Sequence, residues 1–308
     1  MASANDAQRT NSAQERFERL SNESMRVVSP QLGFFSGARA SIGDIFAHRQ
    51  LLHLFTQREV KSRYKDSVLG YLWTLVRPLV NLGIYYFAIG KVLGAERAIP
   101  DFAIYVFAGL TGWTLFSTII SSSTASILGN AGIVKKVYIP RETFPLASAR
   151  AALVDFVSQF AILLVGALLI RGIPWTSAII YGPISFLVLY VWAVGVGLIL
   201  AACNVYLRDI QYLVEVLLMI GFWLTPSVYS FEMIAATAPG WAVNLYLMNP
   251  TAVGVMGFQA AFWQAGQDMQ WPSHLFLRLV IWLLIGLLVL FIGQRIFARL
   301  QRNFAQEL

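Results

Sequence analysis

The feature that most constrains this chain is a series of long apolar runs, and the stretch from Gln57 to Pro78 contains the start of the first one. Its first half is basic, and its second half opens an apolar run that extends from Val68 to Leu93. The basic side chains are Arg58, Lys61, Arg63 and Lys65. Basic residues at the end of a membrane-spanning segment stay on the cytoplasmic side. We therefore expect residues 1–70 to lie in the cytoplasm.

Composition also indicates a membrane protein. Apolar residues make up 57% of the chain and charged residues 13%, whereas soluble domains have about 45–50% and about 25%. The net charge of +7 does not point to nucleic acid, because ten of the 23 basic residues lie in residues 1–70 and most others fall between apolar runs. That distribution is typical of membrane topology. The single cysteine, Cys203, excludes an internal disulfide and a cysteine-based zinc site.

Six apolar segments are predicted to span the membrane, which makes the fold class an all-α integral membrane protein. The segments are residues 72–93, 103–120, 147–170, 179–202, 212–229 and 275–292. A helix of about 20 residues covers the roughly 30 Å hydrocarbon core. An even number of spans returns the C-terminus, with Arg295, Arg299 and Arg302, to the cytoplasm. We expect a multi-pass protein of the cytoplasmic (inner) membrane with both termini inside.

The flanking segments are predicted to have separate roles. We expect residues 1–40 to form a mobile cytoplasmic tail, residues 41–66 an amphipathic interface helix and linker, residues 67–300 the transmembrane domain and residues 301–308 a cytoplasmic C-terminus. Residues 44–57 place apolar and polar side chains on opposite halves of a helix, are too few to span and have Asp44 as a candidate N-cap. The alternative is an ordinary amphipathic helix packed on a soluble core.

Residues 231–272 are moderately apolar but broken by glycine and proline. A seventh span here would place the arginine-rich C-terminus outside, so we expect one or two short re-entrant helices in the outer leaflet. Aromatic residues in this region suit a membrane interface, as anchors or as sugar contacts. They are Trp241, Phe258, Phe262, Trp263 and Trp271.

No segment carries the parts of an enzyme. The sequence lacks the glycine-rich G-x-x-x-x-G-K-[ST] loop that binds nucleotide phosphates. Its acidic residues are scattered singly, without the clusters that a metal-dependent prenyl-phosphate transferase needs. We therefore expect no catalytic residue and no metal ligand here, and any energy for work is expected from a partner.

Several short motifs resemble those of a known family. The motifs are Arg58, Tyr64, Ser67, Leu69, Gly70, Trp73 and Pro78; residues 132–136 with Pro140 and Pro145; and residues 204–210, 225–229 and 248–250. In combination they resemble the membrane subunits of type-2 ATP-binding-cassette exporters of polysaccharide, O-antigen or teichoic acid, the Wzm-like permeases. The resemblance covers about residues 45–300.

The resemblance implies a homodimeric permease whose partners are two copies of a separate cytoplasmic ATPase, a lipid-linked glycan substrate and membrane lipids. ATP and magnesium would bind to the ATPase, so no cofactor is expected on this chain. The implied function is export of a lipid-linked polysaccharide of O-antigen, teichoic acid or galactan type across the cytoplasmic membrane, for cell envelope biogenesis. The loop from Asn130 to Thr143 would dock on the ATPase; its charges also fit a simple positive-inside anchor. Candidate coupling residues are Lys135, Lys136, Tyr138, Arg141, Glu142, Arg208 and Asp209.

The resemblance also implies that the first and fifth spans line the channel. Sugars offer CH faces for stacking and hydroxyls for hydrogen bonds, which favours aromatic channel walls. The aromatic candidates are Tyr85, Tyr86, Phe222, Trp223 and Tyr229; the alternative is that they face lipid or neighbouring helices. Arg77, Asp155 and Glu215 lie at similar predicted depths, and we expect Arg77 to pair with Glu215 or Asp155 as part of a gate, Glu215 being preferred because the resemblance places the first and fifth spans on one channel. The alternative for Arg77 is snorkelling to the interface.

Two other functions remain open from the sequence. One is a drug or small-molecule exporter of the same superfamily, and the other is a membrane-embedded sugar or lipid transferase. A neighbouring ATPase gene would favour transport, and glycosyltransferase genes around the pair would favour polymer export.

Overall fold

The computed structural model describes residues 43–64, 67, 70–136, 139–170, 172, 176–267 and 269–308, apart from the side chains of Tyr64 and Ala305. The chain divides into two units, residues 1–39 and 40–308, and every described residue belongs to the second. The predicted tail, residues 1–40, lies outside the described residues. Helices and short loops, without a strand, make up the part that is described. The predicted all-α fold is thereby confirmed.

Five of the described helical stretches are long and apolar enough to cross a membrane. The first stretch, Gly70–Val92, contains α4 (Trp73–Tyr85) and a π-helical segment (Tyr86–Val92). The second and third are α5 (Phe102–Gly129) and α7 (Thr143–Ile170). The fourth, Ser177–Tyr206, contains α8 (Tyr181–Tyr206), and the fifth, Leu275–Asn303, contains α13 (Leu275–Leu300). A shorter apolar helix, α9 (Ile210–Trp223), occupies the place of the fifth predicted span. The chain is therefore a multi-pass membrane protein.

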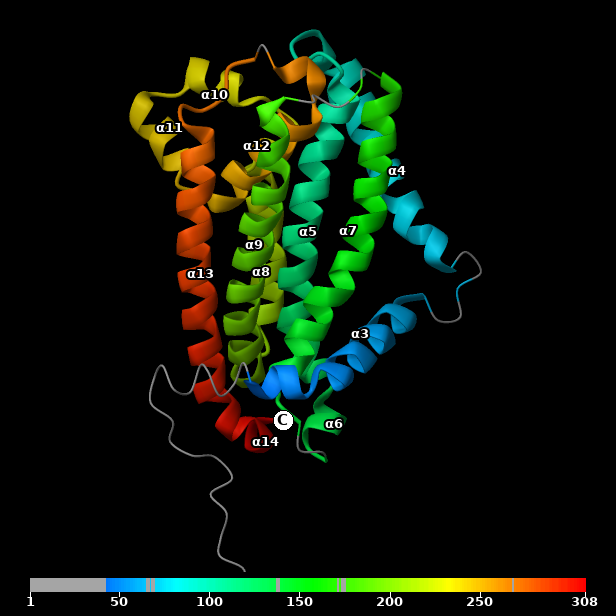
Figure 1. Ribbon diagram of the computed structural model, residues 1–308, viewed down its shortest axis with the longest axis vertical. Coiled ribbons are helices and arrows are strands. Elements are labelled where there is room, and N and C mark those ends of the chain that lie inside the picture. The colour runs from blue at the N-terminus through cyan, green and yellow to red at the C-terminus, as the bar shows by residue number, and fades with distance from the viewer. Residues whose placement is uncertain are drawn as a thin grey trace, which may run out of the picture. The chain divides into compact units, whose positions relative to one another are not determined.

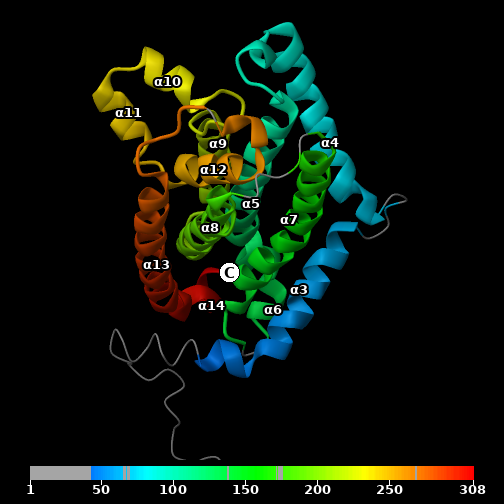
Figure 2. The ribbon, with the colours of Figure 1, turned by 45° about the horizontal axis from the view of Figure 1, so that its top comes forward.

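The short helices lie at the two ends of this bundle (Figure 1). One end, called here the α6 end, carries α6 (Ala131–Val134), α14 (Phe304–Glu307) and the first half of α3 (Arg49–Tyr64). The other end, called the α10 end, carries α10 (Phe231–Thr237) and α11 (Gly240–Tyr246). Helix α13 and the pair α3 and α4 lie on opposite sides of the bundle in both ribbon views (Figure 2).

The core forms around α5 and α8, which pack on each other and on the remaining long helices. Helix α12 (Pro250–Phe262) is buried from Thr251 to Phe262 and packs against α5 and α8, as a short helix surrounded by protein. A Cβ at Gly257 of α12 would overlap Ser185 Oγ of α8, so this contact requires glycine. A backbone that does not span is tolerated at membrane depth because protein encloses it.

The predicted interface position of the aromatic residues is wrong for three of the five. Phe258, Phe262 and Trp263 are 1%, 5% and 1% exposed and pack in the core. Trp271 is half-buried, and Trp241 is 71% exposed at the α10 end. Composition alone could not distinguish a buried short helix from an interfacial one, because both are apolar and rich in aromatic residues.

Several helix boundaries differ from the predicted ones. Helix α5 continues through the polar series after Ile120 to Gly129, and the hydroxyl of Thr124 is satisfied within the helix by donating to the Ile120 carbonyl one turn back. Helix α9 ends at Trp223 instead of Tyr229, because Pro226 follows and disfavours helical geometry in the residue before it. Helix α13 continues beyond residue 292 to Leu300.

The amphipathic segment also differs in its bounds. Residues 43–47 are helical, His48 lies in a turn, and α3 then extends from Arg49 to Tyr64. The predicted segment, 44–57, thus covers the first part of a longer helix. Helix α3 packs on α7, with the Phe55 and Phe144 ring centroids 5.0 Å apart, while Leu54 is 60% exposed.

Candidate functional site

The structure brings the first and fifth predicted spans together through aromatic side chains. The ring of Tyr85 on α4 lies 5.6 Å from that of Phe222 on α9. Phe222 also contacts Trp113 of α5, with ring centroids 5.9 Å apart. Trp223, the next residue, is 55% exposed. Helices α4 and α9 are therefore in contact through the half-buried rings of Tyr85 and Phe222, and the neighbouring indole of Trp223 is exposed.

Apolar side chains are exposed on both helices beside this contact. On α4 they include Leu79, Val80 and Ile84, and on α9 they include Leu213, Val216, Leu217 and Ile220. Glu215 is exposed on the same helix, α9. Thr74 is the one buried residue within α4, and Val214 the one within α9. Within a single chain, most of the surface of these two helices is therefore not covered by other parts of the protein.

Tyr86 belongs to a polar cluster near the α10 end. Its hydroxyl lies 3.5 Å from Glu96 Oε1, and Lys91 Nζ lies 5.4 Å from its ring centroid. Lys91 and Glu96 form an ion pair of 2.7 Å. All three residues lie in or just after the π-helical segment. A π-helical stretch of this kind is rare in proteins and occurs frequently at functional sites.

Tyr229 does not lie on a channel helix, because α9 has already ended. It lies in the turn that follows, where its hydroxyl donates to the carbonyl of Trp223 at 2.7 Å. Its own carbonyl accepts from the Tyr105 hydroxyl at 2.6 Å. The Gln259 side chain of α12 donates to the neighbouring Pro226 carbonyl at 2.7 Å. Tyr229 thus takes part in fixing the turn after α9, a role that its position in the sequence did not indicate.

The predicted ion pair between Arg77 and an acid is not formed. Asp155 pairs instead with Arg63 of α3, at 2.6 Å between Oδ2 and Nη1. Among the described residues Arg77 is in no ion pair; it is exposed, with its guanidinium carbon 5.8 Å from the Trp73 ring centroid. Helix α3 packs on α7, and its Arg63 supplies the counter-charge of Asp155.

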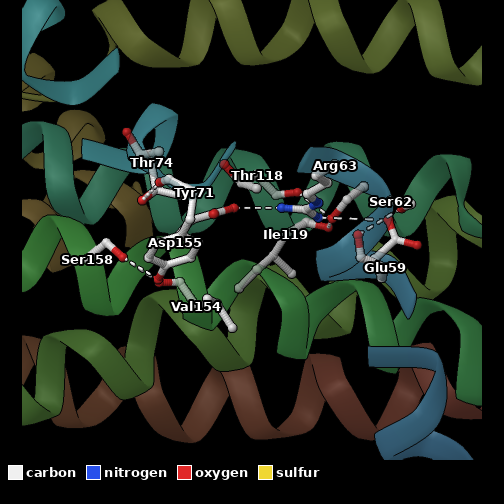
Figure 3. A network of polar contacts seen from close by, with 12 residues as sticks. Glu59, Ser62, Arg63, Tyr71, Thr74, Thr118, Ile119, Val154, Asp155 and Ser158 are labelled. Atoms are coloured by element: carbon white, nitrogen blue, oxygen red, sulfur yellow. Dashed lines mark hydrogen bonds and ion pairs between the residues drawn. The ribbon is translucent and has the colours of Figure 1, made fainter. Parts of the chain in front are cut away.

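Asp155 belongs to a polar network between α3, α7 and the start of α4 (Figure 3). Arg63 also lies 3.9 Å from Glu59, one turn earlier on α3. The Tyr71 hydroxyl and Ser158 Oγ are 2.7 Å apart. The prediction had not included Arg63, Tyr71 or Ser158. An acid inside an apolar span indicates that a polar or charged side chain must lie beside it, but the sequence does not identify which residue that is.

The candidate coupling residues divide into an exposed group and an inward-facing pair. Those that are exposed at the α6 end are Lys135, Lys136, Arg208 and Asp209. Glu142 is 3% exposed and accepts from the Gln301 side chain at 3.1 Å, and Arg141 donates to the Gln301 carbonyl. Arg141 and Glu142 therefore attach the loop to the C-terminal segment. Tyr138 lies outside the described residues.

The described part of the chain contains no cluster of three or more histidine, cysteine, aspartate or glutamate side chains that could hold a metal. Three of its acidic residues, Glu59, Glu96 and Asp155, form ion pairs with basic groups, and Glu142 is buried beside Gln301. Nothing in this arrangement resembles a nucleophile with an adjacent base.

Comparisons with known proteins agree with this architecture. The model of the ABC-2 type transporter membrane family matches residues 50–263. An O-antigen export system permease protein, RfbA, from Klebsiella pneumoniae is 28% identical over 84% of this chain and 95% of its own length. RfbA from Myxococcus xanthus is 30% identical over 72% and 84%. The polysialic acid transport protein KpsM from Escherichia coli is 28% identical over 58% and 69%.

The family match covers most of the described bundle, from α3 to the end of α12. Members of this family are membrane components that work with a separate ATP-binding subunit. The chain therefore belongs to the ABC-2 type transporter family, as a multi-pass transport subunit and not as an enzyme.

Proposed function

We propose that the chain is the permease of an ATP-driven exporter that moves a lipid-linked polysaccharide, of O-antigen type or a related polymer, across the cytoplasmic membrane. The observation that carries this proposal is the similarity to export permeases named for such polymers, over nearly the whole length of the RfbA relatives. The related polymers included in this proposed substrate class are those of teichoic acid and galactan type.

The proposed exporter contains two copies of this chain, related by a two-fold axis. Closed two-fold symmetry is the commonest arrangement of homo-oligomers. The open surfaces of α4 and α9 would face the second copy and the space between the two. Tyr85, Tyr86, Phe222 and Trp223 would line part of that passage, where aromatic rings can stack on sugar CH faces. Glu215 on α9 would supply a polar group to the same passage.

The proposed ATPase contact is the α6 end, where Lys135, Lys136, Arg208 and Asp209 are exposed. A cytoplasmic ATPase would approach this end, and both chain termini would lie on its side. ATP and magnesium would bind in that partner. The exposed charges of the two loops would then contact a single surface of the ATPase. Complementary charges on that surface would favour specific binding in one orientation.

Export can be tested in cells that carry the native genes. Deletion of this chain is expected to remove surface polysaccharide, measured by periodate–hydrazide labelling of intact cells, and to cause polymer to accumulate inside. Plasmid-borne wild-type chain should restore labelling. Unchanged surface labelling together with increased sensitivity to small toxic compounds would support a drug exporter of the same superfamily instead.

The ATPase contact can be tested by charge reversal. We expect Lys135→Glu combined with Lys136→Glu to lower the amount of ATPase that co-purifies with the chain by about tenfold or more, because reversed rim charges slow association and repel the partner. The matched control is Arg97→Glu, an exposed charge in the loop between α4 and α5 near the α10 end. Equal ATPase recovery in both variants would argue against docking at this loop.

A further inference from the structure

Helix α3 contacts the α5–α7 connection through its middle. The Phe55 ring packs on Phe144 in the first turn of α7, with centroids 5.0 Å apart. Arg58 Nη1 donates to Asn130 Oδ1 at 3.0 Å, and Asn130 lies between α5 and α6. The Asn130 amide donates in turn to the Ser126 carbonyl at 2.8 Å. This part of α3 is therefore attached to the loop that the proposed ATPase would contact.

The C-terminal end of α3 is attached much deeper along α7. Arg63 pairs with Asp155 at 2.6 Å, and the two side chains are 23% and 22% exposed. Asp155 follows Thr143, the first residue of α7, by twelve positions, which is about 18 Å of helix rise. A carboxylate at that depth in a membrane span requires a counter-charge. Arg63 provides one from outside the span.

The start of the first span is held on the same strip of α7. The Tyr71 hydroxyl lies 2.7 Å from Ser158 Oγ, and Ser158 is one helical turn beyond Asp155. Thr74, the buried residue of α4, donates to the Tyr71 carbonyl at 2.7 Å. Figure 3 shows these contacts side by side. The chain is thus bound to α7 immediately before and immediately after the connection from α3 to α4.

We infer that Arg63 and Asp155 are positioning residues for transport, which hold the α3–α4 junction on α7 so that movement of the α6 loop is transmitted to α4. Helix α3 is a continuous helix of 16 residues, and both attachments lie within it. Helix α4 has few other buried contacts within the chain. The ion pair attaches α3 to α7 one residue before α3 ends, next to the connection that leads to α4. The inference rests on the proposed roles of the α6 loop and of α4.

The test uses the full chain with its ATPase and a set of charge variants. The variants are Arg63→Asp, Asp155→Arg and the two combined, and Lys61→Asp is the matched control on the exposed side of α3. Each single reversal is expected to lower surface polysaccharide labelling about tenfold, within the usual range of coupling between sites. ATPase co-purification and ATP hydrolysis should stay near wild-type values. The combined swap should restore labelling, and the control should not alter it.

Two conservative variants test whether a loss of export comes from misfolding of the chain. Arg63→Lys keeps the positive charge and should retain most export, whereas Asp155→Asn removes the negative charge and should lower export while the chain still inserts. Normal export in Asp155→Asn, or failure of the combined swap to restore export, would overturn the inference. A parallel loss of export, ATPase binding and protein level in every variant would also overturn it, since that result indicates a purely structural role.

A reporter on α4 separates this inference from the proposed function. In a Cys203→Ser background, an environment-sensitive fluorophore on a cysteine at Val80, which is 54% exposed, should change its emission when ATP is added to the complex in nanodiscs. The change should disappear in each single reversal and return in the swap. If deletion of the chain leaves surface polysaccharide unchanged but the reporter still follows the ion pair, the proposed substrate is wrong and the positioning role stands. A response unaffected by the reversals overturns the positioning role.

Discussion

At the scale of single residues, Tyr105 determines how the chain turns after α9. Its side chain is 1% exposed, and its hydroxyl lies 2.8 Å from the Pro226 carbonyl and 2.6 Å from the Tyr229 carbonyl. Both acceptors belong to a turn without helical hydrogen bonds of its own. Inside a membrane protein such carbonyls need a donor, because no water is available to them. Gln259 supplies another donor to the same Pro226 carbonyl.

Tyr105→Phe is therefore expected to lower the free energy of unfolding by about 1–3 kcal/mol, the cost of leaving buried acceptors with fewer donors. Tyr212→Phe is the matched control, since Tyr212 is 69% exposed on α9. Thermal unfolding of the purified proteins in the same detergent measures the difference. Identical melting temperatures for Tyr105→Phe and wild type would show that the stability of the turn does not depend on the Tyr105 hydroxyl.

At the scale of elements, the short helix α14 closes the α6 end of the bundle. Phe304 is fully buried, with ring centroids 5.6 Å from Phe297 and 6.1 Å from Tyr206. The Arg141 guanidinium carbon lies 5.8 Å from the Phe304 ring centroid. The Tyr206 hydroxyl donates to the Leu300 carbonyl at 2.7 Å. The ends of α8 and α13 and the loop before α7 thus meet around one phenyl ring.

Removal of the Phe304 ring should weaken the packing of α8, α13 and the loop before α7 on one another. Phe304→Ala is expected to cost about 3–5 kcal/mol, the usual range for truncating a buried aromatic side chain. Gln306→Ala, an exposed position on the same helix, should have little effect. Unfolding curves measure the cost, and limited proteolysis should cut faster near Arg141 in Phe304→Ala alone. Unchanged proteolysis would mean that α14 does not stabilise the loop.

At the scale of the whole molecule, the two ends of the bundle should lie on opposite sides of the membrane. Thr237 is exposed at the α10 end and Lys136 at the α6 end. Basic residues favour the cytoplasmic side, which assigns the α6 end to the inside. In a Cys203→Ser background, a cysteine at Thr237 should react with a membrane-impermeant thiol reagent in intact cells. A cysteine at Lys136 should react only after the cells are opened.

Reaction of both cysteines in intact cells would contradict this arrangement. It would require one crossing more or one crossing fewer between residues 136 and 237, the part of the chain that contains α7, α8 and α9. Helix α12, which follows Thr237, is buried from Thr251 to Phe262, and a crossing by it would place Gln267 on the opposite side of the membrane from Thr237. A control cysteine at Gln267, which is exposed near the α10 end, should react like Thr237.

The sequence by itself determined the properties that depend on local composition. Apolar runs of spanning length predicted an all-α membrane protein, and the breaks around Pro239 and Pro250 predicted short helices before the last span. The clustered basic residues assigned an orientation, which stays a prediction. Hydropathy and helical period are properties of a continuous stretch of chain, so they can be read without knowing its neighbours.

Only the tertiary structure decided which side chains meet. Arg77 was expected to pair with Glu215 or Asp155, with Glu215 preferred, but it forms no ion pair among the described residues, and Asp155 pairs with Arg63 because α3 packs along α7. Glu142 was expected on a docking surface, but it is buried against Gln301. Phe258 was expected at a membrane interface, but it lies in the core. Each outcome depends on residues distant in sequence. Inside a membrane protein, a charge or an aromatic ring is placed by the helix packed beside it.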